Sequence, residues 1–213
     1  MTDIVKISRL ERPYPPEVFT DLADDLFMPS PELEAWSRAV FIDEGSILGG
    51  DHNHLQLATI GFLWTNVQHI KQQRQILGTC ELGQPQGSMG KWSRKRAEQQ
   101  VSEWFGGIPD YLITIYTEFA REAADAQWVA LIDHELRHAV QAIDAFGAPK
   151  FNQIGLPVWT IRSHDVEEFI GTVDAFGVDA TESAAFVRSA NSPPKFSSKR
   201  INMVCGHVNR DAV

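Results

Sequence analysis

The 213-residue chain lacks the features that mark membrane, secreted and nucleic-acid-binding proteins. Its two cysteines, Cys80 and Cys205, form no CxxC pair, which favours two free thiols over a disulfide framework. No apolar run reaches the roughly 20 residues that a membrane-spanning helix needs. The net charge of −9 provides no basic field that would hold a phosphate backbone. We therefore expect no membrane and no nucleic-acid partner.

Three further absences bear on the location of the protein and on the organisation of the chain. Residues 1–16 contain no basic segment followed by an uninterrupted apolar core, so no secretory signal is expected and the predicted location is the cytoplasm. The only basic run, at residues 91–96, is interpreted as a solvated helix face. No internal repeat and no low-complexity block is evident. The oligomeric state cannot be inferred from these patterns.

The order of the helix-like and strand-like segments predicts an α+β fold. Helical periodicity and end signals predict helices over residues 17–27, from Pro31 onward, and over 93–105, 122–145 and 163–176. Branched and aromatic residues predict strands over 54–65, 75–82 and 110–120. We divide the chain into an N-terminal arm with helices (1–46), one domain (47–190) and a tail (191–213). The tail is expected to be loosely ordered, except around residues 201–205.

The segment DHELRHA carries the chemistry on the predicted central helix. His134 and His138 are four residues apart, so both project from one face of the helix and can reach one ion. Catalytic zinc takes three protein ligands and leaves the fourth position for water. Glu135 lies next to the first histidine and can reach that water without being a ligand. This arrangement is typical of HExxH metallopeptidases, in which the carboxylate is the general base.

The third ligand is sought in SHDVEEF, at the start of the next predicted helix. His164 and Glu168 are four residues apart and share a face there. We favour His164, because the carboxylates are explained by a helix N-terminus and the histidine is not. Glu168 and Glu167 stay open as alternatives.

Four segments in this order, ILGGDHNHLQLATIGFLWT, YLITIYTEFA, ALIDHELRHA and HDVEEF, resemble the putative phage metallopeptidase family. The resemblance runs from about residue 47 to 177 and implies a zincin-like domain, in which a small mixed β-sheet packs on the HExxH helix with additional helices. It implies that His134 and His138 bind Zn²⁺ and that Glu135 is the catalytic base. HDVEEF is also similar to a motif of the SprT-like proteases, which favours His164 as the third metal ligand. For a phage-encoded chain, the implied location is the host bacterial cytoplasm.

The resemblance also implies a substrate-binding role for one strand. In zincins the strand that borders the cleft pairs with an extended peptide, and we expect residues 111–120 to provide it, with an interior strand as the equal alternative. The main hypothesis is a zinc metallopeptidase that acts on a protein or peptide. The alternative is a zinc-containing phage binding or regulatory protein without turnover, such as an inhibitor of a host defence factor. A third possibility is a hydrolase of non-peptide amides. The remaining histidines, His52, His54, His69 and His207, are expected to be surface or hydrogen-bonded residues.

Overall fold

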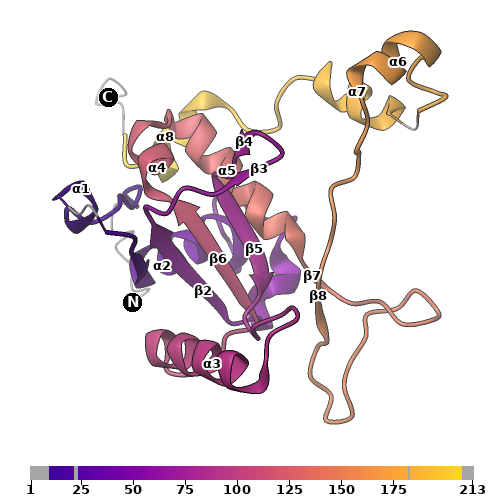
Figure 1. Ribbon diagram of the computed structural model, residues 1–213. Coiled ribbons are helices and arrows are strands. Elements are labelled where there is room, and N and C mark those ends of the chain that lie inside the picture. The colour runs from indigo at the N-terminus through magenta and orange to yellow at the C-terminus, as the bar shows by residue number, and fades with distance from the viewer. Residues whose placement is uncertain (1–9, 22–23, 182, 208–213) are drawn as a thin grey trace, which may run out of the picture.

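A small mixed β-sheet forms the centre of the computed structural model, which describes residues 10–21, 24–181 and 183–207 (Figure 1). Its strands follow the order β1 (Phe27–Pro29), β2 (Ile60–Thr65), β6 (Tyr111–Tyr116) and β5 (Gly78–Leu82). The two central strands are parallel, and each outer strand pairs antiparallel with its neighbour. The predicted α+β class is confirmed.

The prediction that residues 111–120 form the edge strand is wrong. β6 lies between β2 and β5, and the chain turns into helix α4 (Thr117–Glu122) directly after Tyr116. β5 forms one edge of the sheet and lies against helix α5 (Asp125–His138), and β1 forms the other edge. The composition of residues 111–116 did not show whether this strand is interior or at the edge. Their side chains are mostly buried in the folded sheet, but burial of side chains does not show which strands pair on either side.

The alternation of side chains along the strands divides the core between the two faces of the sheet. Ile113 and Ile115 of β6 face the main core together with Trp128 and Ile132 of α5. Leu112 points to the other face, where helix α3 (Lys91–Phe105) covers the sheet. The main core also takes side chains from α2 (Pro31–Ser37), which Ser30 caps, and from the short π-helix η1 (Arg38–Ile42).

Several predicted elements are shorter than expected. The first predicted helix is confined to α1 (Val18–Asp21) within the described residues, since residues 22 and 23 lie outside them and β1 begins at Phe27. The strand predicted over 54–65 opens with the 3₁₀-helix η2 (Asn53–Leu57). Between β2 and β5 the chain adds a hairpin of β3 (Ile70–Lys71) and β4 (Arg74–Gln75).

The central helix ends earlier than predicted, and this changes the geometry after the motif. α5 stops at His138, and β7 (Ala139–Gln141) follows at once, paired with β8 (Trp159–Ile161). The predicted helix over 163–176 begins only at α6 (Ile170–Phe176), so His164 and Glu168 lie in an extended segment. The prediction that they share a helix face is therefore wrong.

The C-terminal segment contributes to the core. After α7 (Ala184–Ala190), residues of the expected tail form α8 (Ser198–Val204), and Val204 is buried. Its carbonyl accepts a 2.8 Å hydrogen bond from the Trp36 indole. The exception expected around residues 201–205 is thus confirmed, while residues 1–9 of the arm and 208–213 of the tail lie outside the described part. The domain boundaries at 46 and 190 stay a prediction.

No helix in the described part of the chain is long and apolar enough to cross a bilayer.

Candidate metal centre

Three imidazoles converge where α5 ends. His134 and His138 come from the last turn of α5, and His164 comes from the extended segment after β8. The Nε2 atom of His134 lies 3.3 Å from that of His138 and 3.1 Å from that of His164. One nitrogen of each ring lies within 4.8 Å of the others. The structure thus brings His164 beside the two motif histidines, while its role as a metal ligand stays a prediction.

The donor atoms fit a tetrahedral metal. Two nitrogens bound to zinc at about 2.0 to 2.1 Å with tetrahedral angles are about 3.3 Å apart, close to the separations found here. The Nδ1 atom of His138 lies 2.6 Å from the carbonyl oxygen of Arg162. With its proton on Nδ1, this ring donates to that carbonyl and keeps the Nε2 lone pair free for an ion.

The pKa of His134 is lowered, first by burial and then by the neighbouring rings of His138 and His164. The neutral imidazole, which is the form that binds metals, is therefore favoured at this position.

The acidic alternatives occupy other places. Glu168 is exposed, and its carboxylate accepts a 2.8 Å hydrogen bond from the Phe169 amide. Asp165 forms an ion pair with Arg162. Glu167 is exposed at the border of the cleft. Among the described residues, the three histidines are the only group of metal-binding side chains within such short distances.

Glu135 is buried, with 3% of its surface exposed, whereas His134 and His138 of the same motif are not. Burial raises the pKa of its carboxyl to about 7. A cation bound at the histidines would lower that pKa again, because an opposite charge nearby favours the carboxylate. Glu135 packs against Gly78 of β5, where an added Cβ would lie 2.7 Å from its Oε1. The missing side chain at residue 78 leaves the space that the carboxylate occupies.

Two histidines outside the cluster form hydrogen bonds with the motif helix and the residue that follows it. The buried His52 donates from Nε2 to Asp133 at 2.8 Å, and His54 Nε2 lies 2.9 Å from the carbonyl of Ala139. The prediction that these histidines are surface or hydrogen-bonded residues is confirmed for both. Arg137 binds Asp133 and also Asp51, so it ties the exposed side of the helix to the segment before η2.

Tyr111 anchors the strands that lead from one histidine to the next. Its ring is buried at the start of β6, and its hydroxyl lies 2.7 Å from the carbonyl oxygen of Val140 and 3.0 Å from that of Thr160. The pKa of this phenol is raised, chiefly by burial. Sequence reasoning missed the roles of Tyr111, although it opens the segment YLITIYTEFA, and of Gly78, because only the folded contacts show them.

An open cleft of about 820 Å³ runs beside the three imidazoles. α5 forms one wall from Gln127 to His138, and β5 with the β3–β4 hairpin forms the other. This stretch of α5 is about 16 Å long, which corresponds to roughly five residues of extended peptide.

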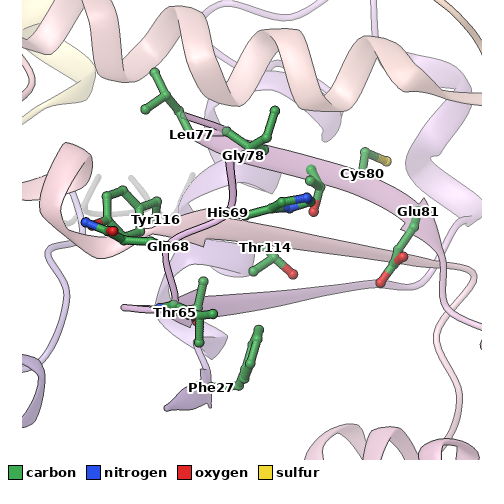
Figure 2. A pocket seen from close by; sticks show the side chains of 13 residues that line it. Phe27, Thr65, Gln68, His69, Leu77, Gly78, Cys80, Glu81, Thr114 and Tyr116 are labelled. Atoms are coloured by element: carbon green, nitrogen blue, oxygen red, sulfur yellow. Dashed lines mark hydrogen bonds between the residues drawn. The ribbon is translucent and has the colours of Figure 1, made fainter. Parts of the chain in front are cut away.

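A second hollow, of about 620 Å³, lies along the other face of β5. Figure 2 shows Thr114 near its centre, with Glu81, His69 and Phe27 around it. Burial raises the pKa of Glu81. Space for side chains is therefore present on both faces of the edge strand.

The family of this chain follows from its sequence match over the same region. The family model described as "Putative phage metallopeptidase" matches residues 27–191, which include the whole sheet, α5 and His164. The chain belongs to the putative phage metallopeptidase family. No curated protein and no solved structure gives a significant match.

Membership in the putative phage metallopeptidase family indicates a metal-dependent peptidase, and hence a metal cofactor and protein or peptide substrates. The three imidazoles are the residues of the described chain that fit such a metal.

Proposed function

We propose that the chain is a zinc-dependent metallopeptidase of the zincin type, with His134, His138 and His164 as metal ligands and Glu135 as the general base. The observation that carries this proposal is the convergence of three Nε2 atoms beside a buried carboxylate, within a cleft that an edge strand borders. Three imidazoles leave one tetrahedral position open, which is typical of catalytic rather than structural zinc sites.

A zinc ion held by His134, His138 and His164 would supply a Lewis acid that polarises the scissile carbonyl and acidifies water. Glu135 takes a proton from the attacking water and delivers it to the leaving amine, because its carboxylate lies between Gly78 of β5 and the last turn of α5, beside the three imidazoles. Burial among protein atoms limits the positions its carboxylate can adopt. His138 is held by the Arg162 carbonyl and keeps its orientation throughout.

β5 is the element that would hold the substrate. Its outer edge has no strand partner within the described residues, so an extended peptide can extend the sheet there. Successive side chains of such a peptide would alternate between the cleft and the hollow on the other face. This geometry favours cleavage within an extended segment of a polypeptide.

The test joins metal analysis to a proteome-wide cleavage screen. Purified protein is expected to hold about one zinc per chain and to generate recurrent new termini in a bacterial lysate. Glu135→Gln keeps the size of the side chain but cannot accept the proton, so zinc should stay while cleavage falls by roughly a hundredfold to ten-thousandfold. New termini that persist at the wild-type rate in this variant would refute the role of Glu135. Bound zinc without any new termini would support the zinc-containing binding protein instead.

A further inference from the structure

Residues 139–161, which lie between the second and third candidate ligands, contain a tandem repeat. DAFGAPKF (144–151) is followed directly by NQIGLPVW (152–159), so an acid or amide, an apolar residue, glycine, a second apolar residue and proline recur at the same spacing. The expectation that the chain has no internal repeat is therefore wrong here. The match was missed because it spans only two short copies that share few identical residues.

The two copies fold alike. The Oδ1 atom of Asp144 accepts hydrogen bonds from the amides of Phe146 and Ala148, at 2.8 and 3.0 Å. Asn152 Oδ1 accepts from the amides two and four residues further on in the same way, at 3.0 Å each. The glycine of each copy has a positive φ, 82° at Gly147 and 79° at Gly155. Each copy is thus a hairpin with a tightly closed tip.

The hairpins meet the β7–β8 stem in a closed ring of three backbone hydrogen bonds. The amide of Ala142 donates to the carbonyl of Val158 at 2.7 Å, and the amide of Val158 donates to the carbonyl of Lys150 at 3.0 Å. The amide of Lys150 closes the ring by donating to the carbonyl of Ala142 at 2.8 Å. We call residues 139–161 the cloverleaf, because a stem and two hairpins radiate from this ring. Figure 1 shows it projecting away from the sheet.

The cloverleaf carries apolar side chains at its outer positions. Phe146 is 94% exposed at one tip and Ile154 is 78% exposed at the other. Ile143, Phe151 and Leu156 of the cloverleaf are exposed as well. Six of the large apolar side chains that the described chain exposes lie in residues 139–161. Exposed apolar residues gathered in this way mark an interaction site, because water solvates them poorly.

Continuity with the cleft indicates what binds there. The stem follows His138 directly, and Ile161, Arg162 and Ser163 line the cleft on the way to His164. A partner on the cloverleaf would therefore lie beside the metal centre. The cleft holds only about five extended residues, so a longer polypeptide would continue past it on this side.

The small number of charged side chains on the cloverleaf also favours a polypeptide as its partner. The charged side chains of the cloverleaf are Asp144 and Lys150, and the carboxylate of Asp144 is engaged by its own hairpin. No basic cluster is present to bind phosphate groups of lipids or nucleic acid. Apolar side chains of an uncharged polypeptide segment match this surface.

We infer that the cloverleaf is a docking site for an apolar, extended segment of the polypeptide substrate, and that it makes the protein selective for unfolded over folded chains. This inference deepens the proposed function and rests on it. The backbone of each tip is already closed by its Asx hydrogen bonds, which reduces the conformational entropy that is lost on binding.

The test measures binding, so that it does not depend on turnover. A fluorescein-labelled globular protein, reduced and carboxymethylated so that it stays unfolded, is titrated with purified Glu135→Gln protein of measured zinc content and followed by anisotropy. Phe146→Ser combined with Ile154→Ser should weaken binding by about tenfold or more, as expected for the loss of two anchoring side chains. The native, folded form of the same protein should bind neither variant. Trp92→Ser is the matched control, because Trp92 is 85% exposed on α3, away from the cleft, and its loss should leave affinity unchanged.

Other outcomes overturn the inference. Equal affinity with and without the double substitution, at unchanged zinc content and circular dichroism, would show that the tips do not bind polypeptide. Self-association that sedimentation detects and the double substitution abolishes would assign the surface to a second copy. Binding to phosphatidylcholine vesicles that is lost in the double variant would assign it to a membrane. Failure of the proposed function would instead appear as missing zinc or missing cleavage, with the anisotropy result standing independently.

Discussion

At the scale of single residues, the contact between Gly78 and Glu135 couples the edge strand to the candidate base. A methyl group at residue 78 would lie 2.7 Å from Oε1 and would push the carboxylate away from the cleft. We predict that Gly78→Ala lowers kcat by about a hundredfold, the effect of a displacement near 1 Å, while zinc content is unchanged. Steady-state kinetics with metal analysis measures both.

The control for Gly78→Ala is Thr79→Ala on the same strand, whose side chain is on the opposite face, so kcat should fall much less. Comparable losses of kcat in the two variants would mean that the strand as a whole, and not the space beside Glu135, is affected.

The second residue-scale prediction separates the candidate third ligands. His164→Ala should weaken zinc binding by more than the roughly 10- to 100-fold that loss of a ligand's hydrogen-bonding neighbour costs. Glu168→Ala should leave zinc affinity nearly unchanged, because its carboxylate bonds the adjacent amide and lies outside the histidine cluster. Competition with a chromogenic chelator measures both affinities. Should Glu168→Ala prove the more damaging change, the extended segment must rearrange when metal binds.

At the scale of elements, Tyr111 connects the sheet to the stem that carries the candidate ligands. Tyr111→Phe removes the hydroxyl near the carbonyls of Val140 and Thr160 and leaves them without this donor. We predict a loss of about 1 to 3 kcal/mol in the free energy of unfolding, together with weaker zinc binding. Urea unfolding and chelator competition provide the two measurements.

Tyr116→Phe is the matched control, since Tyr116 belongs to the same strand but donates to Glu118 at 2.6 Å. Its loss should change stability modestly and zinc affinity not at all. If both tyrosine variants bound zinc as tightly as the wild type, Tyr111 would support the fold without positioning the histidines.

The helices and strands differ in how well the sequence predicted them. Helical spacing correctly predicted α3 and α5 and placed His134 and His138 on one face, because this information is local. It failed at residue 139, since AVQAI continues the helical period while its pairing with Trp159–Ile161 depends on residues about 20 positions away. The same distant pairing holds His164 in an extended segment. His164 was expected at the start of a helix, whereas the structure holds it near His134 in an extended segment.

At the scale of the whole molecule, the N-terminal arm is fastened to the start of α5 by Arg12. Its buried guanidinium donates to the carbonyls of Ala120 and Ala123 and to Asp125, and it stacks on Trp128. We predict that Arg12→Met lowers the free energy of unfolding by roughly 3 kcal/mol, because Asp125 and two carbonyls lose their partner. Urea unfolding monitored by tryptophan fluorescence tests this value.

Arg121→Met serves as its control, since Arg121 makes one long contact of 3.4 Å with the Pro16 carbonyl and should contribute within about 0.5 kcal/mol. An equal loss in both variants would mean that general charge, and not the buried contact network, accounts for the effect.

The ring at the base of the cloverleaf makes this part of the chain tolerant to insertions and deletions of one particular length. Its three members, Ala142, Lys150 and Val158, are eight residues apart, and the repeat has the same length. Removal of 144–151 would join Ile143 to Asn152 and let Ala142 and Val158 exchange both of their hydrogen bonds, so the stem would keep its register with a single hairpin. Addition of another copy would extend the structure without shifting His138 relative to His164. Lineages could therefore gain or lose a hairpin here in one genetic step, and with it change which polypeptides they capture, while the residues proposed for hydrolysis keep their positions.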